Sequence, residues 1–358
     1  MRKIVFWMPR ACMEPAGGFK IVFEYANRLA KDGFPIEIVY PMIHFGARYD
    51  WKHAIAYRLI FLWRLIFKSY KPAKWFHIED PIQQSWLWKL ENYQLKEPAV
   101  IVATAIETAY SLQNYQSKFL EDKFNFIQGF ENWSFTDEQV IQSYHFPIKK
   151  IVISTWLKDI VNSCGEKSVF IPNGFDFTFF NVKNPITDRN EYEVICMYHT
   201  SALKDFSTAF KAFDIVKEKH PQLHVTLFGV FDKPDLPVWY DYYQRPEKEL
   251  FNKLYNNASI YVGSSQIEGW GLTVGEAMQC GCAVACTDNK GYLEMAKDGE
   301  TALVSPVKDS QALAKNIIRL IEDDQLRHTI ALNGNKFIHE FDIEKSYLKL
   351  KKFLNGIN

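Results

Sequence analysis

The stretch Ser264–Gly281, SSQIEGWGLTVGEAMQCG, places two glutamates around a Gly-Trp-Gly turn, directly after the apolar run SIYVG. The apolar run predicts a buried strand and LTVGEAMQC has helical spacing, so SQIEGWG is expected to be the loop at a strand's carboxyl end. Open α/β sheets bind their ligands at that edge. Glu268 lies before the turn, and Glu276 lies about one helical turn inside the helix. Both carboxylates are therefore expected to face one cleft, where such a pair can accept several sugar hydroxyls.

The backbone of the same loop suits an anion. Gly269 and Gly271 allow a tight turn and a close approach to a ligand, and the free amides at the helix start, around Leu272 and Thr273, suit a phosphate. A dinucleotide fingerprint fits less well, because the spacing here is Gly-x-Gly-x3-Gly and the motif comes late in the chain. A purely structural reading stays open, in which the second glutamate is a solvated helix residue and the first caps the helix.

A lysine and a glycine pair occupy two other expected strand-to-helix junctions. Lys204 follows the apolar run VICMYH and precedes a helix with one apolar face, so its ammonium can neutralise a diphosphate as a point charge. Gly17 and Gly18 follow the first strand, and their amides can reach a ligand from the N-terminal domain. An ordinary surface lysine and an ordinary structural turn are the alternatives.

Short apolar runs alternate with helical patterns along the whole chain, which is typical of parallel sheets covered by helices. The first series comprises KIVFWMP, PIEIVYP, AVIVATAI, FNFIQGF, KIVIST and VFIPN, and the second comprises YEVICMYH, HVTLFGV, SIYVGSS, AVACT and TALVSP. Each series predicts a doubly wound α/β domain. The polar, turn-rich segment 171–192 between them predicts a linker. We therefore predict an N-terminal domain over 1–170, a C-terminal domain over 171–340, and a helix in 341–358 for which packing on the N-terminal domain is one option.

Composition narrows the class of protein. A chain of 358 residues with 47% hydrophobic residues can bury two cores. The 42 basic and 42 acidic residues balance, so no overall field attracts nucleic acid. Six scattered cysteines form no disulfide framework and predict reduced thiols in the cytoplasm. The run CGCAVAC lacks a second pair of metal ligands and predicts buried thiols.

The segment Ala54–Phe67, AIAYRLIFLWRLIF, is the most apolar, but two arginines interrupt it and it is too short to span a membrane. Its aromatic and cationic residues suit a helix that lies on an anionic membrane surface. At 100° per residue, Arg64, Lys68 and Lys71 fall within roughly 60° of each other, while the neighbouring cations fall elsewhere. Peripheral contact with the inner face of the plasma membrane and a buried helix whose long cations reach solvent explain the pattern equally well.

Taken in order along the chain, these motifs resemble glycosyltransferase family 4, the retaining, nucleotide-sugar-dependent transferases with the GT-B fold. FIPNGFDFTFF resembles the family's linker signature, and EGWGLTVGEAMQCGCAVACTDNKGYLEMAKDGETALV resembles its Glu-x7-Glu block. The resemblance covers most of the chain and is strongest from Phe170 to Val304. It implies an α/β fold of two doubly wound, Rossmann-like domains that face each other across a cleft.

The resemblance also implies roles for individual residues. Glu276 would bind the ribose of the donor, and Glu268 would contact the hydroxyls of the transferred sugar. Lys204 would hold the diphosphate together with the amides of Leu272 and Thr273. These assignments concern the C-terminal domain alone.

The resemblance further implies that Gly17 and Gly18, in the N-terminal domain, would close over the diphosphate from the other side. Catalysis would then consist mainly of positioning and charge stabilisation. No metal and no further cofactor are implied, because protein cations act on the phosphates. Retention of configuration would follow a front-face mechanism, in which an oxygen of the donor phosphate assists the acceptor hydroxyl.

The chain departs from the family pattern in the phosphate-binding loop. Many relatives have Gly-Arg five or six residues before the lysine, where this chain has Tyr198 and His199. His199 can donate a hydrogen bond there or make a structural one. The usual Lys-Gly is Lys204-Asp205, which brings a negative charge to the expected phosphate site. Arg245 is a candidate substitute cation, and a surface role explains it as well.

The stretch FIQGFENWSF, with Gln128, Glu131 and Trp133, resembles the rhamnosyltransferase branch that builds bacterial surface polysaccharides. It favours a deoxyhexose donor such as dTDP-rhamnose and a glycan or lipid-linked glycan acceptor. Two other functions remain open at this stage. One is a GT-B sugar-nucleotide epimerase or phosphorylase, and the other is a noncatalytic GT-B scaffold that binds glycans or proteins.

Overall fold

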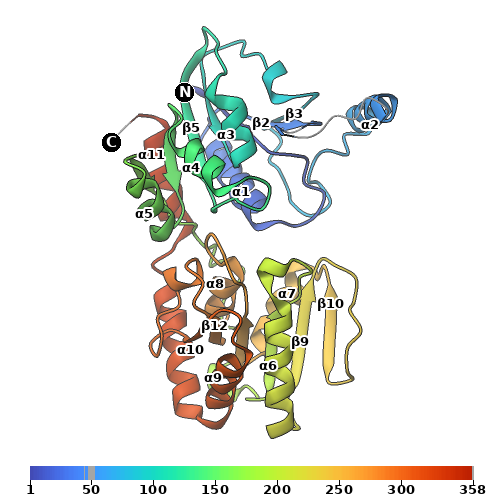
Figure 1. Ribbon diagram of the computed structural model, residues 1–358, viewed down its shortest axis with the longest axis vertical. Coiled ribbons are helices and arrows are strands. Elements are labelled where there is room, and N and C mark those ends of the chain that lie inside the picture. The colour runs from blue at the N-terminus through green and yellow to red at the C-terminus, as the bar shows by residue number, and fades with distance from the viewer. Residues whose placement is uncertain (44, 47–52, 357–358) are drawn as a thin grey trace. The chain divides into compact units, whose positions relative to one another are not determined.

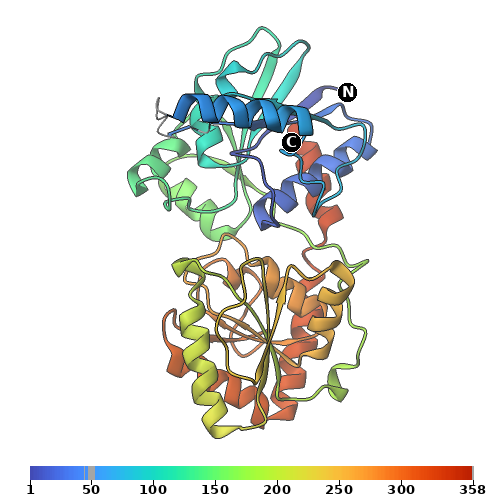
Figure 2. The same cartoon turned by 90° about the vertical axis from the view of Figure 1, so that its right-hand side faces the viewer.

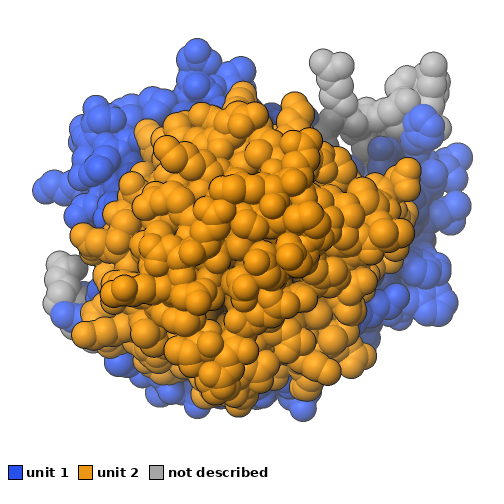
Figure 3. All heavy atoms as spheres, turned by 90° about the horizontal axis from the view of Figure 1, so that it is seen from below, with its two compact units in different colours: residues 1–173, 346–358 blue, residues 174–345 orange. Residues whose placement is uncertain are grey.

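The computed structural model describes residues 1–43, 45–46 and 53–356 (Figure 1). The chain divides into two compact units, which Figure 3 colours separately. Unit 1 comprises Met1–Asn173 and Ser346–Asn358, and unit 2 comprises Gly174–Lys345. The boundary predicted from the sequence stood at 170/171. Each unit is a parallel β-sheet flanked by helices (Figures 1 and 2).

Unit 1 has the strand order β3-β2-β1-β4-β5-β6-β7. Its strands are β1 (Lys3–Trp7), β2 (Ile36–Pro41), β3 (Gln83–Leu87), β4 (Ala99–Ala103), β5 (Leu120–Ile127), β6 (Lys149–Val152) and β7 (Ser168–Phe170). Its helices are α1 (Gly17–Lys31), α2 (Ala54–Phe67), α3 (Ile106–Gln113), α4 (Asp137–Tyr144) and α5 (Thr155–Ser163). The chain returns to this unit through α11 (Ile343–Leu354).

Unit 2 has the strand order β10-β9-β8-β11-β12-β13. Its strands are β8 (Glu193–Met197), β9 (His224–Gly229), β10 (Tyr240–Gln244), β11 (Ile260–Gly263), β12 (Ala283–Thr287) and β13 (Leu303–Ser305). Its helices are α6 (Phe206–Lys219), α7 (Lys248–Asn257), α8 (Leu272–Gln279), α9 (Ser310–Glu322) and α10 (Asp324–Ile338). Short 3-10 helices at Ala202–Lys204 and Tyr292–Glu294 interrupt its loops.

The central strands form because both of their faces are buried. β1 and β4 of unit 1 and β11 and β12 of unit 2 are almost wholly buried and pair in parallel with their neighbours. In each unit the first and the fourth strand are neighbours in the sheet. The second and third strands add on one side of this pair and the later strands on the other, so the chain reverses its direction there. In unit 2 this switch point lies between β8 and β11. The loops that leave the carboxyl ends of these two strands are therefore neighbours.

The segment predicted as a linker is packed against unit 2 along most of its length. The ring of Phe180 is buried edge-on against Phe251 and Tyr255. Asn256 Oδ1 accepts the amide of Lys183 at 2.6 Å, and Asn256 Nδ2 donates to Asn181 O at 3.0 Å. Residues 174–192 are thus part of the C-terminal unit, and the polar composition reflects hydrogen bonds to α7 instead of an open connection.

Helix α11 packs against α1 within unit 1. Tyr347 Oη donates to Arg28 O at 3.2 Å and also to the carboxylate of Asp32. Lys351 Nζ lies 2.6 Å from Asp32 Oδ2. The C-terminal helix therefore closes the side of unit 1 at the end of α1. In the part of the chain that the structure describes, no helix has both the length and the apolar character needed to cross a membrane.

Candidate functional site

The loops after β8 and β11 bring Lys204 and Glu268 into direct contact. Lys204 Nζ lies 2.6 Å from Glu268 Oε1. The two side chains are 28% and 14% exposed, so the pair is shielded from bulk water but open on one side. The sequence predicted both residues as ligand contacts, and the topological switch point of unit 2 places them together.

Backbone hydrogen bonds hold the two loops in register. The amide of Gln266 donates to Leu203 O at 2.8 Å, and its side-chain Nε2 donates to Ala202 O at 3.1 Å. Ser264 Oγ donates to Lys204 O at 3.3 Å. These bonds fix the backbone from Ala202 to Lys204, and the ion pair with Glu268 holds the ammonium group in place.

A buried polar network supports Glu268 from behind. Ser265 Oγ donates to Glu268 Oε1 at 2.8 Å, and Tyr292 Oη donates to Ser265 Oγ at 3.1 Å. A Cβ on Gly291 would lie 2.3 Å from Glu268 O, so this position accommodates only glycine without a shift of the loop. Ser265, Tyr292 and Gly291 were not predicted as parts of the site, and the single glycine in NKGYLE is the one sequence feature that pointed to them.

The start of α8 has the features expected of an anion site. Gly271 precedes the helix with φ of 105°, and a Cβ there would lie 2.6 Å from Tyr292 Cδ1. Glycine is therefore required by conformation and by space. Because glycine has no side chain, Gly271 does not cap the amides of α8, and the first turn of the helix carries no acidic residue. The amides of Leu272 and Thr273 stand at this end of the helix, while the hydroxyl of Thr273 accepts a bond from Tyr261 Oη at 2.7 Å.

Glu276 lies on the buried side of α8. Its residue exposure is 7%, and Glu276 Oε2 is 3.5 Å from Tyr255 Oη. The alternative that Glu276 is a solvated helix residue is therefore wrong. The carboxylate of Glu276 is held inside unit 2 and not in bulk solvent.

His199 makes the structural bond that was one of its two predicted roles, and it keeps a donor for the other. The amide of Ser201 donates to His199 Nδ1 at 2.9 Å, so the neutral ring carries its proton on Nε2. Burial, and then the positive charge of Lys204, lower the pKa of His199, although Glu268 acts in the opposite direction. The ring is neutral at pH 7 and offers one N–H.

Asp205 takes the place of the expected glycine and does so in a left-handed conformation, with φ of 45°. Aspartate tolerates this region better than most residues with a side chain. Its carboxylate accepts Ser207 Oγ at 2.8 Å and Thr208 Oγ1 at 2.9 Å. Burial opposes ionisation, but the hydrogen bonds from the first turn of α6 and from Gln266 outweigh it and lower the pKa of Asp205. The negative charge is thus engaged within its own helix start.

Arg245, the proposed substitute cation, is exposed in the loop after the edge strand β10, with φ of 48°. β9 separates β10 from β8 in the sheet. The described contacts therefore associate Arg245 with the sheet edge, where Arg245 N donates to Gly229 O at 2.7 Å.

Gly17 and Gly18 belong to unit 1, where they open α1 without an acidic residue in the first turn. A Cβ on Gly18 would lie 3.2 Å from Gln128 Oε1, and Gln128 Nε2 donates to Thr104 O at 3.2 Å. These contacts gather the two glycines and the end of β5 at the carboxyl edge of the unit 1 sheet. Trp133, in contrast, is 61% exposed.

Glu131 is buried in unit 1 and accepts the amide of Ile106, at the start of α3, at 2.7 Å. Burial raises the pKa of Glu131 to about 8. The folded protein therefore keeps a proton that the unfolded chain releases above pH 4 to 5, so stability is lost as the pH rises from there through about 8.

We expect the melting temperature to fall between pH 6 and 9, and to fall less in Glu131→Gln. Differential scanning calorimetry across this range would show it, with exposed Glu249→Gln as the control; equal slopes in all three proteins would contradict the assignment.

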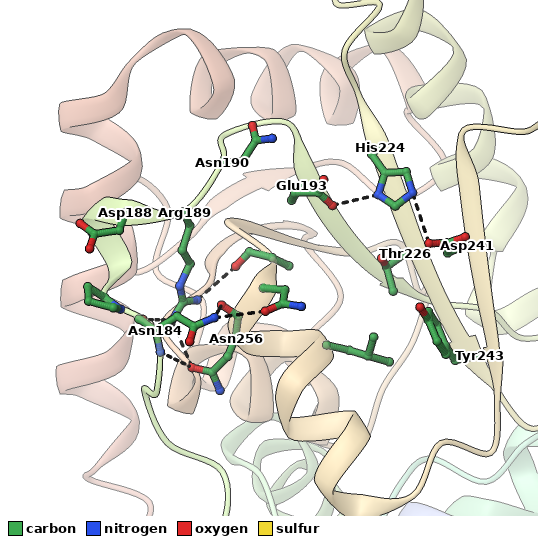
Figure 4. A pocket seen from close by; sticks show the side chains of 14 residues that line it. Asn184, Asp188, Arg189, Asn190, Glu193, His224, Thr226, Asp241, Tyr243 and Asn256 are labelled. Atoms are coloured by element: carbon green, nitrogen blue, oxygen red, sulfur yellow. Dashed lines mark hydrogen bonds and ion pairs between the residues drawn. The ribbon is translucent and has the colours of Figure 1, made fainter.

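A pocket of about 570 Å³ lies at the opposite ends of the unit 2 strands (Figure 4). His224 stands between Glu193 and Asp241, with its ring nitrogens 2.8 and 3.5 Å from their carboxylates. Arg189 donates to Ala258 O at 3.1 Å and to Cys280 O at 2.7 Å. The bonds of Arg189 tie the segment before β8 to the loop before β11 and to the end of α8. The pocket is thus separate from the Lys204 site.

The cysteines of the run CGCAVAC lie inside unit 2. Cys280, Cys282 and Cys286 are buried and free, as predicted. Within 1–43, 45–46 and 53–356, no group of three or more His, Cys, Asp or Glu side chains is arranged to hold a metal ion.

Comparison with known sequences connects this site to a family. Residues 179–337 match the family described as Glycosyl transferases group 1. A phosphatidyl-myo-inositol mannosyltransferase from Mycolicibacterium smegmatis is 23% identical over 220 residues, which cover 57% of this chain and 56% of that protein. The capsular polysaccharide biosynthesis glycosyltransferase CapM from Staphylococcus aureus is 24% identical over 200 residues, 51% of this chain and 53% of that protein. The chain thus spans about half the length of the curated relatives it matches.

A solved structure is similar over nearly the full chain. HepE from Anabaena, in complex with UDP-glucose, has a TM-score of 0.71 and 17% sequence identity, covering 99% of this chain and 100% of that chain. Identity at this level supports the fold alone, and the predicted GT-B class with two Rossmann-like α/β units is confirmed. The stretch that matches the family Glycosyl transferases group 1, residues 179–337, contains the Lys204–Glu268 pair and the start of α8, and the chain has the GT-B fold.

Proposed function

We propose that the protein is a glycosyltransferase that moves a sugar from a nucleoside diphosphate to an acceptor hydroxyl. The observation that carries this proposal is the Lys204–Glu268 pair, held at 2.6 Å beside the glycine-capped start of α8. A cation and free helix amides are the groups that bind phosphate, and a shielded carboxylate is a group that binds sugar hydroxyls. The names of the matched relatives, a mannosyltransferase and a capsular polysaccharide glycosyltransferase, support the same reaction class.

The proposed donor site uses the geometry of unit 2. Lys204 and the amides of Leu272 and Thr273 bind the diphosphate. His199 Nε2–H supplies a neutral donor where related sequences have an arginine, which fits its lowered pKa. Glu276, buried further along α8, accepts the ribose hydroxyls. UDP-glucose bound in HepE supports a nucleoside diphosphate sugar as the donor class.

The proposed reaction retains the anomeric configuration. The bond from the sugar C1 to the diphosphate oxygen breaks, a bond from C1 to the acceptor oxygen forms on the same face, and the acceptor proton passes to the departing phosphate. Negative charge develops on the diphosphate, where Lys204 and the α8 amides stabilise it in a partly dehydrated site. Glu268 orients the sugar through its hydroxyls. Because protein groups neutralise the phosphates, we propose that no metal takes part and that EDTA leaves turnover unchanged.

We further propose rhamnose as the transferred sugar, with dTDP-rhamnose as donor and a glycan or lipid-linked glycan of a surface polysaccharide as acceptor. The support for rhamnose is the stretch FIQGFENWSF, and the support for the acceptor class is the polysaccharide and glycolipid chemistry named in the relatives. The proposed compartment is the cytoplasm, in keeping with six free cysteines.

A thermal-shift panel of UDP, dTDP, GDP and ADP tests the donor class. A ligand present at 100 times its Kd stabilises the fold by about 2.7 kcal/mol, which corresponds to roughly 5 to 10 °C for a domain of this size. We expect dTDP to give the largest shift. A larger shift with UDP or GDP would overturn the rhamnose assignment, and no shift with any of the four would overturn the proposed donor site. Incubation of the donor with and without acceptor then separates transfer from epimerisation, since an epimerase converts the donor alone.

A further inference from the structure

Helix α2 in unit 1 exposes an unusual amount of apolar surface. Among the described residues of Ala54–Phe67 none is buried, and Ile55 and Ile66 are 75% and 70% exposed. The exposed large apolar side chains of this helix are Ile55, Leu59, Ile60, Leu62, Trp63, Leu65, Ile66 and Phe67. Figure 2 shows the helix, in blue, along its length at the side of unit 1. A contiguous apolar patch of this kind marks a binding surface.

One face of α2 is attached to the sheet edge. The ring of Phe61 stacks on Trp86 at 6.0 Å and meets Trp88 edge-on at 5.5 Å. The guanidinium of Arg64 lies over the Trp86 ring at 5.4 Å. The residues of intermediate exposure, Ala54, Tyr57, Phe61 and Arg64, follow helical spacing. These contacts with β3 and the residue after it fix which side of the helix faces outward.

The outward face is apolar and has Arg58 at one margin. At 100° per residue, Ile55, Leu59, Leu62, Trp63 and Ile66 fall within an arc of roughly 100° whose centre lies about 150° from Phe61. No charged residue falls within this arc. Arg58 lies about 40° beyond Leu62 at one margin of this arc, whereas Arg64 lies on the face attached to Trp86.

The charge around α2 has one sign. Every charged side chain from 53 to 78 is Lys or Arg, and the next acidic residue along the chain is Glu79. After Arg58 and Arg64 on the helix, the cations continue with Lys68, Lys71 and Lys74. Such a segment is complementary to an anionic surface, whereas two copies placed face to face would bring like charges together.

We propose that α2 docks the protein onto a membrane surface containing anionic phospholipid. The apolar arc enters the boundary between headgroups and acyl chains, and Arg58 together with the lysines that follow the helix contacts the lipid phosphates. The helix lies parallel to the surface, because its 14 residues span only about 21 Å, less than the roughly 30 Å of a hydrocarbon core. Trp63, at 54% exposure, is an interfacial anchor at one edge of the arc.

Flotation of the full chain with vesicles tests the proposal. We expect the protein to float with phosphatidylcholine vesicles containing 30 mol% phosphatidylglycerol, and to bind pure phosphatidylcholine at least about tenfold more weakly. Leu59→Gln/Ile66→Gln should reduce binding at least about tenfold with charge unchanged, while Leu348→Gln, an equally exposed leucine on α11, should bind as the parent does. Arg58→Gln/Lys68→Gln should reduce binding to the anionic vesicles and leave binding to pure phosphatidylcholine unchanged.

Quenching places the helix relative to the bilayer. Lipid brominated on its acyl chains should quench part of the tryptophan emission in the parent and clearly less in Trp63→Phe. Absence of flotation with anionic vesicles would overturn the proposal. So would a concentration-dependent dimer that Leu59→Gln/Ile66→Gln converts to monomer, because the face would then bind a second copy. Circular dichroism and melting of each variant check that it is folded.

Discussion

Replacement of Lys204 by alanine is expected to lower kcat/KM for sugar transfer by about 10²- to 10³-fold, the loss typical of removing one preorganised charge-stabilising group. The ammonium is held by the paired loops at 2.6 Å from Glu268, and no other lysine or arginine is within hydrogen-bond range of that carboxylate among the described contacts. Its loss removes the positive charge that meets the departing diphosphate. Steady-state kinetics with the identified donor would measure the effect.

Lys211→Ala on the exposed side of α6 is the matched control and should leave kcat/KM unchanged. The melting temperature of Lys204→Ala should stay within a few degrees of the parent, because Ser265 still donates to Glu268. Parent-like turnover in a folded Lys204→Ala protein would show that the diphosphate binds without this group.

Replacement of Glu276 by glutamine is expected to weaken binding of the nucleoside diphosphate by about 10- to 100-fold. A hydrogen bond to a charged acceptor contributes roughly 1.5–3 kcal/mol, and every 1.4 kcal/mol changes Kd about tenfold. Glutamine keeps the shape of a side chain that is only 7% exposed, so packing against Tyr255 is preserved. Isothermal titration calorimetry would give the change in Kd.

The control for this substitution is Glu249→Gln on the exposed side of α7, which alters charge by the same amount without changing α8. It should bind the nucleotide as the parent does. Unchanged affinity in Glu276→Gln would mean that the ribose is bound elsewhere.

The central strands of both sheets could be predicted because each is buried on both faces and reads as an apolar run. The edge strands β3, QQSWL, and β10, YDYYQ, could not be predicted in this way. Each has only one fully buried residue, so its sequence is polar and gives no apolar run. β3 is placed by its pairing with β2, and β10 by its pairing with β9. The residues of β3 and β10 do not themselves specify this pairing.

The residues of the candidate site could be predicted from the sequence, but their contacts could not. Glycine content and strand-to-helix position identified Lys204, Glu268 and the start of α8 as ligand-binding candidates. Their contact depends on the switch point between β8 and β11 and joins residues 64 positions apart, which local spacing cannot reveal. Asp205 was expected to disturb the phosphate site, but its left-handed backbone and its bonds to α6 explain how aspartate serves there.

The most direct test of the account is a crystal structure of the protein with the nucleoside diphosphate that gives the largest thermal shift. The account predicts phosphate oxygens about 2.7–3.2 Å from Lys204 Nζ and from the amides of Leu272 and Thr273, with the ribose hydroxyls at Glu276. A diphosphate bound at the far ends of the strands, beside Arg189 and His224, or one bound with Lys204 turned away, would contradict it.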